Sequence, residues 1–341
     1  MGMTENNNRF DLDEQLAGAK SIGICGHIRP DGDAVGSCLG MYLFFRKYYP
    51  EVFVRVYLQK PSDIFAFLKG ESELCQDAEE EITYDLFITL DCSDFERLGD
   101  YITYFKTAGR TLCIDHHVTN NAFAQTNYIL PEASSTCEIV ADLIGIDRID
   151  YDMAQALYMG IAHDTGVFQY KCTSSHTMEL AGALMDKGIP YSRIISDTYY
   201  VKTYVQQQLL GRALLESVRM LDGRVIFSAV RVKDLDFFCA TSMDLEGIVS
   251  ILRQTTGVEV AIFLYELRPQ EWKVSLRSTQ IVDVAKVAAF FKGGGHVRAA
   301  GCTMQGRMHD VVNNIVEHVA RQLEEAEKIQ RAEGSEEPDH P

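Results

Sequence analysis

The chain has 341 residues, 46% of them hydrophobic, so it is long enough to form two domains that each bury a core. Its 32 basic and 49 acidic residues give a formal net charge of -17, which opposes non-specific binding to long polyanions such as duplex nucleic acid. The nine cysteines are dispersed without a C-x-x-C pair, the N-terminus lacks a signal peptide, and no apolar run is long enough to cross a bilayer, so we expect a cytoplasmic protein with reduced thiols.

The first half of the chain alternates short apolar runs with segments of helical periodicity. We predict strands at 21–25, 52–58, 86–90 and 111–114 and helices at 34–48, 135–144, 151–162 and 176–187. This alternation is typical of an α/β domain whose sheet is mainly parallel and flanked by helices.

The second half opens with an amphipathic segment that carries no strand signal, which we interpret as a linker helix. A second, smaller α/β unit follows, with predicted strands at 225–230, 258–266 and 271–277 and helices at 245–253, 282–291 and 309–325. The last residues are polar and acidic, which predicts disorder. The expected organisation is therefore a first domain at 1–190, a linker helix at 191–222, a second domain at 223–326 and an acidic disordered tail at 327–341.

Carboxylate and imidazole side chains follow three of the predicted strands and end one helix. They are His27, Asp31 and Asp33 after the first strand, Asp91 after the third, Asp115, His116 and His117 after the fourth, and Asp164 at the end of the helix. Functional groups gather beyond the carboxyl ends of the strands in an open parallel sheet, so we expect these side chains to meet at one edge. Such ligands, without cysteine, favour Mn²⁺, Mg²⁺ or a related cation over structural zinc. Asp91 is the best candidate to bridge two ions.

Each of these groups also has a simpler explanation when it is taken alone. Asp31 and Asp33 fit a turn around a glycine, one of the two adjacent histidines fits a strand terminus, and Asp164 fits a helix end. Four separate groups, three of them at strand exits, instead favour a shared site for two divalent cations. We assign His163 to ordinary packing, because consecutive helical side chains point in different directions.

A glycine-rich stretch follows a predicted helix in the second half. It contains Gly293, Gly294, Gly295, His296 and Arg298. Glycine amides can form an anion-binding nest, and the two cationic side chains can add charge-assisted hydrogen bonds to a phosphate. A flexible linker is the alternative. Arg277, at the end of a predicted strand, is a further cation that can meet the same phosphate, although an exposed strand arginine fits equally well.

Together these motifs resemble the DHH phosphoesterase family, and specifically its two-domain members with a DHHA1 domain, similar to nanoRNases and 3′-phosphoadenosine 5′-phosphate phosphatases. The resemblance extends from about residue 21 to residue 325 and rests on the order of the motifs: His-x-x-x-Asp-x-Asp, a single Asp, Asp-His-His, Asp-Thr-Gly and Gly-Gly-Gly-His. It implies a DHH domain with a mainly parallel sheet, a linker helix and a smaller α/β DHHA1 domain.

The resemblance also implies a role for each residue. His27 and Asp31 hold one Mn²⁺, Asp33, His116 and Asp164 hold the other, and Asp91 bridges the two. Asp115 orients the neighbouring histidine, and His117 faces the scissile phosphate. In the second domain the substrate's terminal phosphate or base is gripped by Arg277, Gly293, Gly294, Gly295 and His296, with Arg298 beside them.

The activity implied by the resemblance is that of a manganese-dependent phosphodiesterase or exonuclease that degrades short oligoribonucleotides or linear dinucleotides to mononucleotides, with Mg²⁺ as the alternative cation. Removal of the 3′-phosphate of 3′-phosphoadenosine 5′-phosphate is a further expected activity. Two alternatives stay open: a cyclic-dinucleotide phosphodiesterase, and a catalytically silent nucleotide-binding regulator, which the presence of all six ligands disfavours. We expect short RNA or a small nucleotide as the partner, and neither long duplex nucleic acid nor a membrane; the resemblance is compatible with a homodimer.

Overall fold

The computed structural model describes residues 10–78 and 81–333, with the backbone alone for residues 330–333. The chain divides into two compact units between Val201 and Lys202, inside the segment 191–222 that we expected to connect two domains. Within the described residues, no helix has both the length and the apolar character needed to span a membrane.

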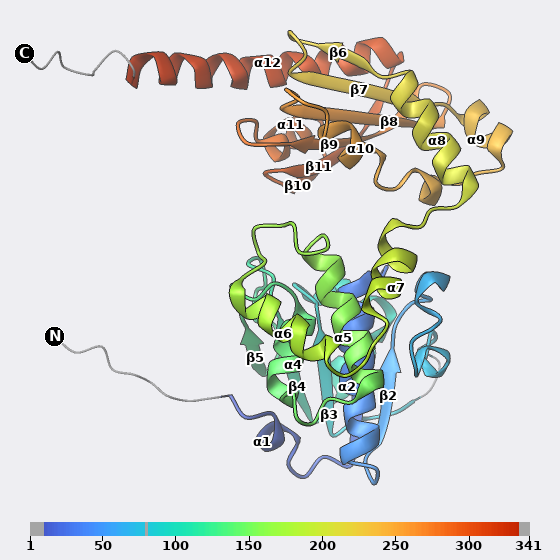
Figure 1. Cartoon of the computed structure of the whole chain (residues 1–341), viewed down its shortest axis with the longest axis vertical. Helices are drawn as coiled ribbons and strands as arrows, with labels where there is room; N and C mark the ends of the chain where they lie inside the picture. The colour runs from blue at the N-terminus through green and yellow to red at the C-terminus, as the bar shows by residue number, and fades with distance from the viewer. Residues whose placement is uncertain (1–9, 79–80, 334–341) are drawn as a thin grey trace, which may run out of the picture. The chain divides into compact units, whose positions relative to one another are not determined.

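A five-stranded parallel sheet forms the centre of the first unit, in the order β2-β1-β3-β4-β5 (Figure 1). Its strands are β1 (Ser21–Cys25), β2 (Phe53–Tyr57), β3 (Leu86–Leu90), β4 (Arg110–Asp115) and β5 (Thr126–Ile129). All five residues of the central strand β3 are buried, as is typical of a strand covered on both faces. The predicted mainly parallel sheet is confirmed, and β5, which the sequence analysis missed, is a half-exposed edge strand.

Four longer helices flank this sheet: α2 (Gly32–Tyr48), α4 (Thr136–Ile144), α5 (Tyr151–Asp164) and α6 (Ser175–Met185). Asp31 begins α2 as its N-cap, since its carboxylate accepts hydrogen bonds from the backbone amides of Asp33 and Ala34. Helix α5 packs closely beside α4, because Gly160 lies so near Cys137 that a Cβ there would be 2.2 Å from the cysteine Sγ. The shorter elements are α1 (Leu12–Leu16), η1 (Asp63–Phe65), η2 (Glu71–Glu73), η3 (Phe95–Tyr101), α3 (Ile102–Thr107), α7 (Tyr191–Ile195) and the π-helical turn η4 (Ser196–Tyr200).

The second unit contains a mixed six-stranded sheet in the order β10-β11-β9-β8-β7-β6. Only β7 and β8 pair in parallel among its described strands. The strands are β6 (Val218–Met220), β7 (Val225–Val230), β8 (Val260–Arg268), β9 (Glu271–Ser278), β10 (Gly294–His296) and β11 (Ala299–Gln305). One face is buried against α11 (Val284–Phe290) and α12 (Met308–Glu333), and the other against α8 (Tyr204–Leu215) and α10 (Ile248–Arg253). The remaining elements are α9 (Val232–Phe238) and η5 (Ser242–Leu245).

Two predictions about the connections are wrong in part. The segment 191–222 is not one helix, because the chain leaves helical geometry after η4 and Thr203 starts α8 with a capping box in which it exchanges hydrogen bonds with Gln206. Helix α12 also continues to Glu333, so residues 327–333 of the expected disordered tail are helical. The rest of that predicted tail lies outside the described residues.

Candidate active site

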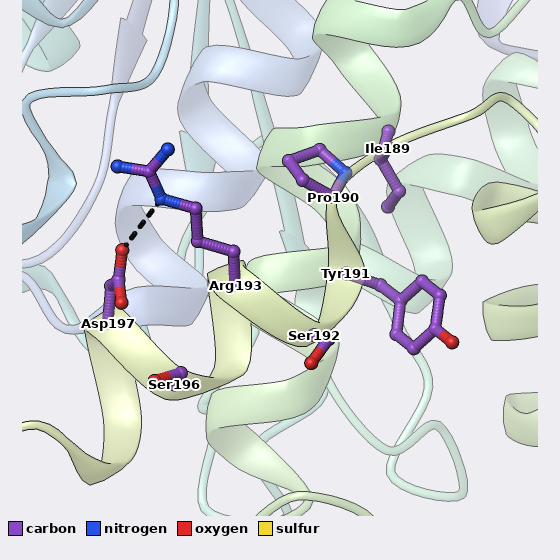
Figure 2. A pocket seen from close by; sticks show the side chains of 7 residues that line it. All are labelled: Ile189, Pro190, Tyr191, Ser192, Arg193, Ser196 and Asp197. Atoms are coloured by element: carbon purple, nitrogen blue, oxygen red, sulfur yellow. Dashed lines mark hydrogen bonds and ion pairs between the residues drawn. The ribbon is translucent and has the colours of Figure 1, made fainter.

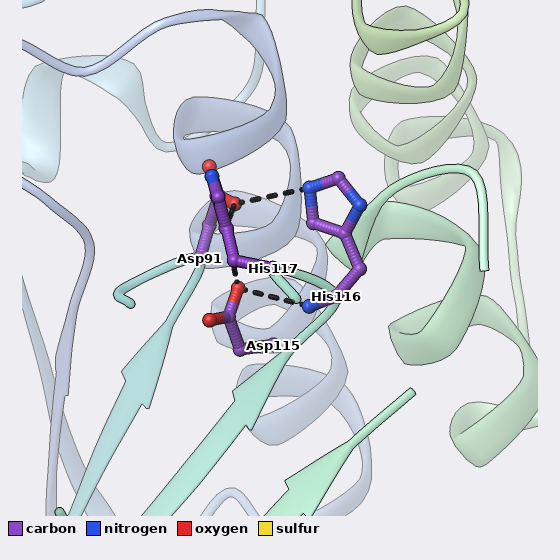
Figure 3. A group of neighbouring side chains, drawn as sticks. All are labelled: Asp91, Asp115, His116 and His117. Atoms are coloured by element: carbon purple, nitrogen blue, oxygen red, sulfur yellow. Dashed lines mark hydrogen bonds and ion pairs between the residues drawn. The ribbon is translucent and has the colours of Figure 1, made fainter. Parts of the chain in front are cut away.

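The predicted ligands meet at the carboxyl edge of the parallel sheet. Asp91 directly follows β3, with a left-handed backbone (φ 57°), and Asp115 is the last residue of β4. Figure 3 shows the side chains of Asp91, Asp115, His116 and His117 converging from these two strand ends. Asp31 and Asp33 lie at the start of α2, directly after the loop from β1, and Asp164 ends α5.

One group of ligands consists of His27, Asp31 and Asp91, whose ligand atoms all lie within 4.8 Å of one another. Nε2 of His27 is 3.6 Å from Asp31 Oδ1 and 3.4 Å from Asp91 Oδ2. Nδ1 of His27 is 2.8 Å from the backbone carbonyl oxygen of Ile28. A carbonyl only accepts, so Nδ1 carries a proton there, and Nε2 is the nitrogen that faces the carboxylates.

A second group consists of Asp33, His116 and Asp164. Nε2 of His116 lies 3.1 Å from Asp164 Oδ2, 4.0 Å from Asp33 Oδ2 and 3.7 Å from Asp91 Oδ1. This nitrogen is buried and has no hydrogen-bond partner among the described residues. Asp91 therefore presents one carboxylate oxygen to each group, as a bridging ligand does.

The charges in this cluster are poorly compensated by the protein alone. Burial raises the pKa of Asp33 well above its usual value, and the neighbouring carboxylates of Asp91 and Asp164 raise it further. Burial lowers the pKa of His27 and of His116, but their carboxylate neighbours outweigh burial and raise both pKa values to about 10. Closely packed carboxylates and an orphaned buried imidazole nitrogen fit divalent cations, which compensate the charge and accept oxygen and nitrogen ligands.

Asp33 is held by the N-terminus of α4. Its two carboxylate oxygens accept the backbone amides of Thr136 at 2.6 Å and Cys137 at 2.8 Å. Ser135 caps the helix by accepting the Glu138 amide at 3.1 Å. Because these donors are backbone amides at the positive end of a helix, they fix the orientation of Asp33 and favour its charged form.

The turn that begins α4 is itself fixed by a buried carboxylate. Glu138 accepts hydrogen bonds from the hydroxyls of Ser134 at 2.5 Å and Thr177 at 2.7 Å. These bonds connect α4 to the start of α6. The sequence analysis did not identify this support, although Ser-Ser-Thr-Cys-Glu is a helix-start pattern.

Asp115 connects the second histidine of the motif to the sheet. Its Oδ1 lies 2.8 Å from Nδ1 of His117, and its Oδ2 accepts from Nδ2 of Asn120 at 2.6 Å. Burial raises the pKa of Asp115, but the hydrogen bonds from His117 and Asn120 outweigh it and hold the pKa below its usual value. Asn120 also donates to the backbone carbonyl of Cys92 at 2.9 Å, so it joins the loops after β3 and β4. The sequence analysis missed Asn120, whose only signal is its position three residues after His117.

The remaining predicted residues lie in the second unit. Gly294 and His296 belong to β10, so the expected glycine loop is wrong in part: these residues form an exposed edge strand paired with β11. Arg277 lies on β9 and donates to the carbonyl of Leu276 at 3.0 Å. Arg298 donates to the carbonyls of Val282, at 2.9 Å, and Gln280, so its guanidinium holds the segment that follows β9 in place. Its predicted contact with substrate stays a prediction.

A separate hollow of about 490 Å³ lies beside α7 (Figure 2). Arg193 and Asp197, which form an ion pair 3.0 Å long, are among the residues that line it. None of the predicted site residues is among those that line it, which are Ile189, Pro190, Tyr191, Ser192, Arg193, Ser196 and Asp197. We therefore assign no chemistry to this hollow.

Comparison with known families agrees with the fold and with this cluster. The model of the DHH family N-terminal domain matches residues 21–161, and the model of the DHHA1 domain matches residues 222–325. The chain belongs to the DHH family and carries a DHHA1 domain, as its motifs suggested. It is an enzyme of the phosphoesterase class.

Similar proteins cover nearly the whole chain. A protein of Thermus thermophilus named bifunctional oligoribonuclease and PAP phosphatase NrnA is 28% identical over 308 residues, which are 89% of this chain and 91% of that protein. The Bacillus subtilis protein of the same name is 25% identical over 283 residues, 82% of this chain and 87% of its own. A crystal structure of an exopolyphosphatase-related protein from Bacteroides fragilis has a TM-score of 0.83 at 28% identity and covers 91% of this chain and 94% of its own.

Proposed function

We propose that this enzyme is a divalent-cation-dependent phosphodiesterase that degrades short oligoribonucleotides or linear dinucleotides to mononucleotides and also removes the 3′-phosphate of 3′-phosphoadenosine 5′-phosphate. The observation that carries the proposal is the arrangement of two ligand groups around one shared carboxylate, Asp91. The names of its relatives from Thermus thermophilus and Bacillus subtilis support the substrate class.

Two cations, which we propose to be Mn²⁺, occupy this cluster. His27 and Asp31 would hold one, Asp33, His116 and Asp164 would hold the other, and Asp91 would be the ligand shared by both. When bound, such a pair supplies Lewis-acid stabilisation of the charge that develops on the phosphate. The protein fixes the ligands beforehand: the α4 amides orient Asp33, and the Ile28 carbonyl fixes the tautomer of His27.

His117 acts on the substrate rather than as a ligand in this proposal. Asp115 takes a hydrogen bond from its Nδ1, which leaves Nε2 as the nitrogen that contacts the scissile phosphate or its leaving oxygen. The side chain is 28% exposed, against 16% for His116, so it is the more accessible of the adjacent pair. Asn120 and Asp115 are then positioning residues that keep this imidazole in one orientation.

In the second unit we propose that Arg277, His296 and the backbone of Gly293, Gly294 and Gly295 bind the remaining nucleotide or terminal phosphate of the substrate. Gly294, Gly295 and His296 are exposed, and β10 is the last strand of its sheet among the described residues, so its outer edge presents backbone groups to a ligand. Arg298, with its guanidinium on two carbonyls, keeps the adjoining chain in place.

We place the enzyme in the cytoplasm. The chain has nine cysteines, dispersed along the sequence without a C-x-x-C pair. An odd and dispersed set of cysteines fits a reducing compartment.

A substrate panel tests the proposal. The full chain is incubated with a ribodinucleotide, 3′-phosphoadenosine 5′-phosphate or a cyclic dinucleotide, each with Mn²⁺ or Mg²⁺, and products are separated by chromatography. We expect mononucleotides from the linear dinucleotide with the wild type and none with Asp91→Ala, while the surface variant Asp142→Asn keeps wild-type turnover. Unchanged turnover in Asp91→Ala would exclude this site, and a clear preference for the cyclic substrate would replace the substrate assignment.

A further inference from the structure

His163, which the sequence analysis assigned to packing, lies at a junction of three chain segments in the first unit. It occupies the last turn of α5, next to the predicted ligand Asp164. Its Nε2 is 2.8 Å from Oγ1 of Thr198, which belongs to the π-helical turn η4. Its ring lies 5.5 Å from that of Phe65 and 5.7 Å, edge to face, from that of Tyr199.

The same imidazole rests on the backbone between two other predicted ligands. A Cβ built on Gly32 would lie 2.4 Å from Cγ of His163, so only glycine allows the ring to lie this close. Gly32 stands between Asp31 and Asp33 at the start of α2. His163 therefore fills the space between the segment that carries Asp31 and Asp33 and the helix end that carries Asp164.

Thr198 fixes the orientation of this ring. Its hydroxyl donates to the backbone carbonyl of Ile194 at 2.8 Å, so the same oxygen accepts a hydrogen bond from Nε2 of His163. Thr198 is buried, and it lies in a π-helical turn, a conformation that recurs at functional sites. The ring is thus held by a directional bond as well as by packing.

The chain directly after Asp164 has an unusual backbone conformation. Gly166, Val167 and Phe168 all have left-handed backbones, with φ of 57°, 57° and 65°. This conformation is strained for a β-branched residue such as valine and persists only where its surroundings impose it. The backbone directly after Asp164 is therefore imposed by the contacts around it.

We propose that His163 is a positioning residue for the cation held by Asp33, His116 and Asp164, and that its hydrogen bond to Thr198 fixes the spacing between Asp33 and Asp164. This inference rests on the proposed function, because it assigns the cation site of that same cluster. His163 itself contacts neither cation nor substrate. It acts through the backbones of Gly32 and Asp164.

Cation binding measured by calorimetry separates positioning from simple packing. The full-length wild type, the two single variants Thr198→Val and His163→Phe, and the double variant are each titrated with Mn²⁺. Thr198→Val keeps the side-chain volume but removes the hydroxyl, and His163→Phe keeps an aromatic ring but removes the nitrogen that donates. The matched control is His176→Phe, which breaks an exposed imidazole–carboxylate bond of the same 2.8 Å length in the same unit.

We expect the weaker of two Mn²⁺ affinities to fall about tenfold or more in each single variant, as is typical when a group that orients a metal ligand is removed. The double variant should fall no further than the stronger single variant, because both changes remove one bond. kcat on a ribodinucleotide should fall while KM is retained, and His176→Phe should behave as the wild type.

Wild-type Mn²⁺ affinities in Thr198→Val and His163→Phe, with or without a lower melting temperature, would overturn the inference and leave His163 a packing residue. The failure of the proposed function is distinguishable, because the wild type itself would then bind no pair of cations and cleave no dinucleotide.

Discussion

Replacing Asn120 by alanine tests the arrangement that orients His117. The Asn120 amide donates to the Asp115 carboxylate at 2.6 Å and to the Cys92 carbonyl at 2.9 Å. The Asp115 side chain is fully buried, so the group that loses its donor receives no replacement from water. Asn120→Ala therefore leaves Oδ2 of Asp115 without its donor. The carboxylate can then rotate, which weakens the hydrogen bond between its Oδ1 and His117.

The size of the effect follows from the type of bond. A hydrogen bond to a charged group is worth about 1.5–3 kcal/mol. If that energy serves to orient His117 in the transition state, kcat falls by about ten- to a hundredfold, since roughly 1.4 kcal/mol corresponds to a factor of ten. KM should change little, because the groups proposed to bind the far end of the substrate lie in the second unit.

Initial rates on a ribodinucleotide, with urea denaturation of the same samples, measure the two effects separately. The control is Asn121→Ala, since Asn121 is exposed and its side chain makes no hydrogen bond with the described residues. Wild-type kcat in Asn120→Ala, together with reduced stability, would show that His117 does not depend on this bond.

Three further changes test the scaffold around the site. Asp150→Ala should lower the free energy of unfolding by about 1 kcal/mol at pH 7, because Asp150 caps α5 and pairs with Lys47 at 2.9 Å. Burial raises the pKa of Asp150 but Lys47 holds it below its usual 3.8, so the stabilisation exists above that value and the deficit should vanish as urea titrations move to lower pH. Gly160→Ala should destabilise by about 1–3 kcal/mol through its clash with Cys137, and adding Cys137→Ala should recover part of the loss in thermal melts. Arg298→Ala should speed hydrogen exchange at residues 278–282, because its guanidinium holds the carbonyls of Gln280 and Val282, and should leave Mn²⁺ affinity unchanged; slow exchange in that variant would contradict this role.

The sheet and the grouping of the ligands were predictable because strand exits determine where these side chains lie. The apolar runs around Ile24, Ile88 and Ile114 identify three neighbouring parallel strands, and polar groups directly after such strands share one edge. All six predicted cation ligands lie in the two groups, and Asp91 of the first group also has an oxygen 3.7 Å from Nε2 of His116 in the second. Their roles in binding remain predictions.

The supporting contacts were not predictable from residue types. Asp33 is held by the amides of Thr136 and Cys137, and a backbone amide has no residue-specific signal. Asn120 contacts Asp115 because the chain turns back after β4. Hydrophobic periodicity predicts helices and strands but not the path of such a turn. His163 was judged by the direction of its side chain relative to Asp164, whereas its contacts lie on Gly32 and Thr198, which are distant in sequence.

The errors concern segments whose partners are remote. Gly294 and Gly295 have poor strand propensity, yet they pair with Gly301 and Ala300 of β11, which are small enough to allow a close hairpin. The linker was predicted as one helix from its amphipathic pattern, but the capping box at Thr203 starts a new helix. In the glycine segment, pairing with β11 overrides the poor local strand propensity. In the linker, the capping box at Thr203 overrides the continuous helical pattern.

The central claim is that Asp91 bridges two cations, and anomalous diffraction from a crystal of the full chain grown with Mn²⁺ tests it most directly. The account predicts two anomalous peaks in the first unit, both in contact with the Asp91 carboxylate, one beside His27 and the other beside His116. A single peak away from Asp91, or no peak among these side chains at saturating Mn²⁺, would contradict it.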